Sequence, residues 1–162
     1  MTIAEILKKT IAFFDGNLHD IQHMLKVWGY AKTIGELEGL DPETQFILET
    51  TAIVHDTSCP CCRSKYGSAP GPLQEQEGPA VAKELLKDAG LTGKQLERVA
   101  FLVSKHHTYS NVDGLDWQIL LEADYLVNAA EGSYSKDAIS RFLEFYVNTP
   151  TGTALMRSIF RV

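Results

Sequence analysis

The sequence predicts an all-α fold, built as one compact bundle of several helices. Three observations predict it: apolar residues recur at helical spacing, helix start and stop signals bracket these stretches, and strand-like alternation is weak throughout. Hydrophobic residues make up 44% of the 162 residues and charged residues 22%, a balance typical of a folded globular chain. We expect a single domain over residues 1–162, with a core at about 15–130 that the helices of 135–162 complete.

The first two helices have clear boundary signals. Thr2 and Glu5 form a capping-box pattern at the start of the first helix, and the Asp-Gly-Asn turn at 15–17 ends it. Asp20 is expected to cap the second helix, because a short side-chain oxygen satisfies free backbone N–H groups. Gly39 is expected to end that helix.

The remaining elements follow from similar signals. Asp41, Pro42 and Glu43 predict the start of a third helix that runs to Val54. The segment 59–72 is rich in Pro, Gly and Ser, and we expect a long, functional loop there. Five further helices are expected near residues 74–88, 92–106, 117–127, 136–147 and 151–160.

Charge and composition exclude several classes of partner. The formal net charge is −6 and no run of Lys or Arg stands out, so we expect neither duplex DNA nor a membrane as a partner. No apolar run approaches the roughly 18 residues of a membrane span, and no signal-peptide pattern begins the chain. The odd cluster of Cys59, Cys61 and Cys62 fits a reducing compartment, so we expect a cytoplasmic protein.

Several histidine and aspartate residues fall in apolar surroundings. Asp124 lies inside an apolar run, and His55-Asp56 ends the apolar helix of 46–54. A buried carboxylate is costly without a cation, which is either a metal ion or Lys/Arg. Together with His23, these residues offer two imidazoles and two carboxylates. Such a set suits divalent ions such as Fe, Mn, Co, Ni, Zn or Mg.

The order of these residues resembles the signature of the HD superfamily of metal-dependent phosphohydrolases. Similar contexts surround them in HDIQHMLKV (19–27), TAIVHD (51–56), EGPAVA (77–82), KHH (105–107) and LLEADYL (120–126). The resemblance spans roughly residues 15 to 130 and implies a single HD domain. It implies metal ligands at His23, His55, Asp56 and Asp124.

One position departs from the pattern of this family. Members with two metals carry a histidine four residues before the glycine of the EGPAVA segment, where this chain has Gln74. The resemblance therefore implies one divalent ion rather than two, with Glu75 or Glu77 as weak substitutes for the histidine.

The resemblance and the chemistry together imply hydrolysis of a phosphoester by an activated water. Asp56 would orient that water, and His106 or His107 would bind the phosphate or protonate the leaving oxygen. The expected partner is a small phosphorylated molecule, a nucleotide being one candidate, and the C-terminal helices are candidates for a homodimer surface. The candidate substrate-binding residues are Arg63, Lys65, Tyr66, Gln74 and Glu77.

Three other interpretations remain open. The domain could be a non-catalytic sensor module that binds metal or nucleotide. Cys59-Pro60-Cys61-Cys62 has the spacing of a Cys-x-x-Cys thiol site, although no βαβ pattern surrounds it. The four polar residues could also satisfy one another in the core with no metal, at the expense of burying two carboxylates.

Overall fold

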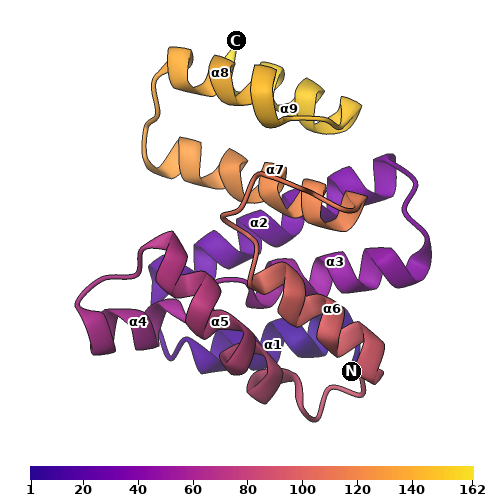
Figure 1. Cartoon of the computed structure of the whole chain (residues 1–162), viewed down its shortest axis with the longest axis vertical. Helices are drawn as coiled ribbons and strands as arrows, with labels where there is room; N and C mark the ends of the chain where they lie inside the picture. The colour runs from indigo at the N-terminus through magenta and orange to yellow at the C-terminus, as the bar shows by residue number, and fades with distance from the viewer.

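The computed structural model describes all 162 residues and contains nine α-helices and no strand (Figure 1). The all-α prediction is confirmed. The helices in chain order are α1 (Ile3–Phe13), α2 (Leu18–Leu37), α3 (Pro42–Val54), α4 (Cys59–Tyr66), α5 (Gly71–Leu86), α6 (Gly93–Val103), α7 (Leu115–Glu131), α8 (Lys136–Tyr146) and α9 (Pro150–Phe160).

Most helix boundaries follow the local signals in the sequence. Thr2 and Glu5 form the expected capping box of α1. The side chain of Asp41 accepts hydrogen bonds from the backbone N–H of Glu43 and of Thr44, both at 3.0 Å, and so caps α3. These bonds satisfy N–H groups that have no partner within the helix.

The predicted cap of α2 is wrong by three residues. Asn17 is the N-cap, and its side chain accepts a hydrogen bond from the backbone N–H of Asp20 at 3.2 Å. Asp20 lies inside the first turn, where its carboxylate pairs with the Arg63 guanidinium. Asn and Asp are about equally good caps, so only the position of the helix start distinguishes them.

The long loop predicted for residues 59–72 is also wrong, because α4 occupies its first half. Pro60 lies in the first turn of this helix, where its missing N–H has no intrahelical partner to lose. Gly67 ends α4 in the left-handed conformation at φ 80°, and its N–H donates to the carbonyl of Arg63. Proline and glycine therefore mark the two ends of a short helix.

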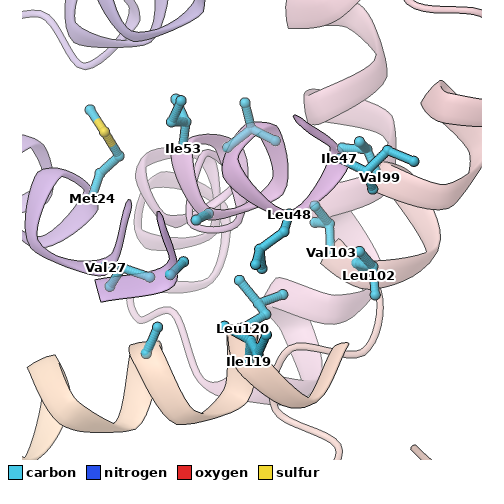
Figure 2. Close-up of a cluster of buried hydrophobic side chains, with 14 of the residues drawn as sticks. Met24, Val27, Ile47, Leu48, Ile53, Val99, Leu102, Val103, Ile119 and Leu120 are labelled. Atoms are coloured by element: carbon cyan, nitrogen blue, oxygen red, sulfur yellow. The ribbon is translucent and has the colours of Figure 1, made fainter. Parts of the chain in front are cut away.

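Helix α3 lies at the centre of the core and contacts α1, α2, α6 and α7. All of its residues from Ile47 to Val54 are buried, including the polar Glu49, Thr50 and Thr51, so this half of the helix has no solvent-facing side. Figure 2 shows Leu48 of α3 pointing toward Leu120 of α7, with Val103 of α6 close by. This packing brings the C-terminal end of α3 against α2 and α7.

The last two helices, α8 and α9, form a pair at one end of the molecule, beyond α7 (Figure 1). The carboxylate of Glu122, which is fully buried, ties this pair to α7. It accepts hydrogen bonds from the backbone N–H of Asn148 at 2.8 Å and of Thr149 at 3.0 Å. No helix combines the length and the hydropathy needed to cross a lipid bilayer.

Candidate metal centre

Three helices bring together the four residues predicted as metal ligands. His23 lies on α2, His55 and Asp56 directly follow α3, and Asp124 lies on α7. Nε2 of His23 is 3.2 Å from Oδ1 of Asp124 and 3.3 Å from Oδ2 of Asp56. Nε2 of His55 is 3.5 Å from each of the same two oxygens. Each imidazole therefore faces both carboxylates.

These separations match those between ligands of one small ion. Ligand atoms about 2.1 Å from an ion lie about 3.0 Å apart at right angles and about 3.4 Å apart in a tetrahedron. The donor atoms of His23, His55 and Asp56 all lie within 4.8 Å of one another, and this group could hold a metal ion. Asp124 contacts both imidazoles of the group.

His55 provides the most direct indication that a cation belongs here. Its side chain is fully buried, and Nδ1 donates to the carbonyl of Ala52 at 2.8 Å. Because Nδ1 carries the proton in this arrangement, Nε2 presents a lone pair to two carboxylate oxygens. Nε2 has no hydrogen-bond partner. A buried polar atom without a partner costs about 1–3 kcal/mol, and a metal ion would satisfy it.

The two carboxylates are ionised in this setting. Burial acts to raise the pKa of Asp124, but the hydrogen bond with His23 and the neighbouring imidazoles of His23 and His55 bring it below its usual range. Burial likewise acts to raise the pKa of Asp56, but the imidazoles of His55 and His106, which lie against it, lower it. Two ionised carboxylates within a largely buried group form a site that favours a divalent cation.

Glu131, which the sequence analysis did not single out, supports His23 from behind. Its Oε2 lies 2.9 Å from Nδ1 of His23, and its Oε1 accepts from Lys26 at 2.8 Å. Burial acts to lower the pKa of His23, but Asp124, Asp56 and Glu131 raise it to about 9. A carboxylate behind a histidine is the usual partner of a metal ligand. The spacing of seven residues from Asp124, two turns along α7, is the signal that could have identified Glu131.

His106 and His107 lie on the other side of Asp56. Nε2 of His106 is 3.4 Å from Oδ1 of Asp56, and Nδ1 of His106 donates to the carbonyl of Val103 at 2.7 Å. The sequence left open which histidine faces the cluster. His106 is fully buried against Asp56, while His107 is only half-buried.

Gln74 lies where its carbonyl oxygen meets both of these histidines. Its Oε1 is 3.1 Å from Nε2 of His106 and 2.8 Å from Nε2 of His107. Burial and the neighbouring His106 lower the pKa of His107 to about 4, so His107 is neutral and donates to Gln74. Asp56, His106 and His107 form a second group that could hold a metal ion, but the Gln74 amide already engages both imidazoles.

The predicted substrate-binding residues separate into two places. Arg63 pairs with Asp20, which precedes the candidate ligand His23 by one turn of α2, so its guanidinium lies about one helical turn from the cluster. Lys65 and Tyr66 instead bind Glu77, at 3.1 Å and 2.7 Å. These three residues hold α4 against α5 and make no contact with the four candidate ligands.

The cysteines lie on α4 and form no disulfide. Burial and the nearby charge of Asp56 raise the pKa of the Cys59 thiol far above its usual range. A redox-active cysteine needs the opposite shift, because the thiolate is the reactive form. This arrangement does not favour a Cys-x-x-Cys redox site.

Comparison with known proteins adds no relative to this description. No family model, no curated protein and no solved structure matches the chain. Geometry therefore defines its class: an all-α protein with a largely buried His/Asp cluster that could hold a metal ion.

Proposed function

We propose that this chain is a metal-dependent phosphohydrolase of the HD type, acting on a small phosphoester. The observation that carries the proposal is the Nε2 atom of His55, which is buried, has no hydrogen-bond partner and faces two ionised carboxylates. The order His23, His55-Asp56, Asp124 along the chain, which resembles the HD signature, supports the assignment to this class.

The proposed ion would polarise a phosphate oxygen and acidify a water molecule. The residues of the chain have separate tasks. Asp56 is the member of the cluster most open to solvent, at 19% side-chain exposure, so substrate approaches from its side. Its two oxygens face the ligand cluster and His106, which suits Asp56 to orient the attacking water.

Arg63 and His107 are the proposed contacts of the phosphate group. The side chain of Arg63 is 42% exposed and its guanidinium is oriented by Asp20, so it can turn two N–H groups toward an anion. His107 is neutral and carries its proton on the nitrogen that binds Gln74. If a phosphate oxygen took the place of the Gln74 carbonyl oxygen as acceptor, His107 would still donate that hydrogen bond.

A second candidate function is a sensor module that binds metal and ligand without turnover. Gln74 favours this alternative, because its side chain occupies both histidines near Asp56. Turnover of a panel of phosphoesters that depends on added Mn²⁺, Co²⁺ or Ni²⁺ would support the enzyme. Tight binding of the same compounds without turnover would support the module.

Metal content tests the first step of the proposal. Purified protein should contain about one equivalent of a transition metal per chain by elemental analysis, and the variants His55→Ala and Asp124→Ala should lose it. The matched control is His19→Ala, which removes a neighbouring histidine whose side chain is 76% exposed and lies outside the cluster. Full metal content in both ligand variants would contradict the assignment.

A further inference from the structure

A separate cavity of about 340 Å³ borders α7, the helix that carries the candidate ligand Asp124. Its walls come from the segment after α6, from α7 and from the C-terminal end of α8. Pockets of about 300 Å³ and more are large enough for a small organic molecule. None of the four candidate metal ligands lines this cavity, so it is a distinct feature of the molecule.

The lining combines aromatic rings with amide side chains. The rings are those of Tyr109, Phe145 and Tyr146, and the amides those of Asn111, Gln118 and Asn148. The rings of Tyr109 and Tyr146 lie 5.2 Å apart and are inclined by 51°. Aromatic faces stack on planar rings, and amides pair with the donors and acceptors on the edge of a heterocycle.

Part of this polar lining is unused within the protein. The amide of Gln118 is committed, since it donates to Glu122 and to the carbonyl of Tyr146 and accepts from Asn148. The side-chain oxygen of Asn148 makes no hydrogen bond, and neither polar atom of the Asn111 side chain makes one. A ligand in the cavity would therefore meet free donor and acceptor groups.

Helix α7 connects the cavity to the metal centre. Leu121 and Gln118 line the cavity and precede Asp124 by three and six residues. At about 1.5 Å per residue, they lie roughly 4.5 Å and 9 Å along the axis from that ligand. The cavity lining and a candidate metal ligand therefore lie within two turns of each other on the same helix.

Among the three aromatic residues of the lining, Tyr109 is the least exposed. Its ring lines the cavity, and its hydroxyl makes no hydrogen bond within the chain. Burial raises the pKa of Tyr109, so its hydroxyl stays protonated and can donate to a ligand in the cavity. Tyr109 therefore adds a ring and an uncommitted hydroxyl to the lining of the cavity.

We propose that this aromatic–amide cavity binds a planar heteroaromatic ring with a hydrogen-bonding edge, such as a nucleobase. The consequence for substrate choice rests on the proposed function: phosphoesters that carry such a ring would be preferred over those that lack one. Ring binding itself does not require turnover.

The proposal is tested by calorimetry on the full chain. The two probes are a purine nucleoside 5′-monophosphate and ribose 5-phosphate. The nucleotide should bind more tightly than the sugar phosphate. Tyr146→Ala should weaken nucleotide binding by about tenfold, as loss of one stacking face does, and leave ribose 5-phosphate unchanged. Tyr146→Phe, which keeps the ring, is the matched control and should bind like the parent. Tyr146 is 45% exposed at the end of α8, so its truncation should leave the fold intact.

The outcomes separate this proposal from the proposed function. One outcome is that Tyr146→Ala weakens nucleotide binding while no phosphoester is hydrolysed. This outcome supports ring binding in the cavity and contradicts the proposed enzymatic activity. Another outcome is metal-dependent hydrolysis with equal kcat/KM for both probes, which Tyr146→Ala does not change. This outcome supports the proposed enzymatic activity and contradicts ring binding in the cavity. Binding of p-nitrophenyl phosphate as tight as that of the nucleotide would show that the cavity recognises any aromatic ring. It would contradict the proposal that the amides recognise the hydrogen-bonding edge of a heteroaromatic ring.

Discussion

At the residue scale, the histidines of the centre are held by bonds that point away from it. Nδ1 of His55 and Nδ1 of His106 each bind the carbonyl three residues earlier, and Nδ1 of His23 binds Glu131. In each case Nε2 is directed toward a carboxylate of the cluster. Such bonds set the ring orientation before an ion arrives, which lowers the entropic cost of binding it.

The carboxylate behind His23 should therefore tune metal affinity. Glu131→Gln keeps a hydrogen-bond acceptor but removes the charge, and we expect metal affinity to fall about 10–100-fold. Lys26→Met is the control, since Lys26 contacts only the outer oxygen of Glu131 and is 49% exposed. Metal titration with a competing chelator measures both variants. If Glu131→Gln and the parent bind the metal with equal affinity, the charge of Glu131 does not contribute to metal binding.

Metal binding should also release a proton from His23. Its pKa in the metal-free protein is about 9, so the ring is cationic at pH 7, whereas a metal ligand must be neutral. Because the folded pKa lies above the usual value, affinity should rise with pH up to about 9 and level off above it. Calorimetry in two buffers of different ionisation enthalpy should give about one proton released at pH 7.5 and none at pH 10. No release at pH 7.5 would contradict this protonation state.

At the scale of the elements, α4 shows how short signals can be misread. The composition of 59–72 is that of a loop, yet Pro60 and Gly67 occupy positions that begin and end a helix. The helix places Arg63 four residues after Cys59, on the side that faces Asp20. Because the composition suggested a loop, the sequence did not indicate the contact between Arg63 and Asp20 that brings a guanidinium close to the cluster.

The left-handed C-cap of α4 should be measurable as stability. Gly67 has φ 80° with open space around it, so Gly67→Ala introduces backbone strain and no steric clash. We expect a loss of about 1 kcal/mol and a fall in Tm of about 2–4 °C by calorimetric scan. Gly93→Ala at the start of α6, also in open space and without positive φ, should have no such effect. Identical Tm values for the two variants would contradict this account.

At the scale of the whole molecule, the metal centre lies where α2, α3 and α7 meet. These three helices also pack against one another in the core, so an ion would join elements that already share their apolar contacts. Without an ion, the largely buried group holds two carboxylates and an imidazole nitrogen that has no partner. Ion binding and folding should therefore be coupled.

Removal of the metal should accordingly lower stability. Treatment with a strong chelator should reduce the Tm of the metal-loaded protein by about 5–10 °C, the shift expected when a ligand present at about 100 times its Kd is lost. The His55→Ala variant should show no change on chelation, because it has no bound metal to lose. A chelator effect of equal size in His55→Ala would point to a metal site elsewhere.

The sequence predicted much of the fold because helix formation is largely local. Capping residues and apolar periodicity act within a few positions, so Asp41 indicated the start of α3 correctly. The position of Asn17 relative to Asp20 was missed, since both residues cap equally well. Glu131 was missed because its only signal is a spacing of two turns from Asp124.

The sequence by itself determined the helices and the order of His23, His55, Asp56 and Asp124 along them. Only the tertiary structure decided which side chains meet. It turned His106 toward Asp56, directed His107 to Gln74, and formed the aromatic–amide cavity beside α7. The reason is that the two histidine contacts join residues 50 and 33 positions apart, and the packing of whole helices fixes such distances rather than any local propensity.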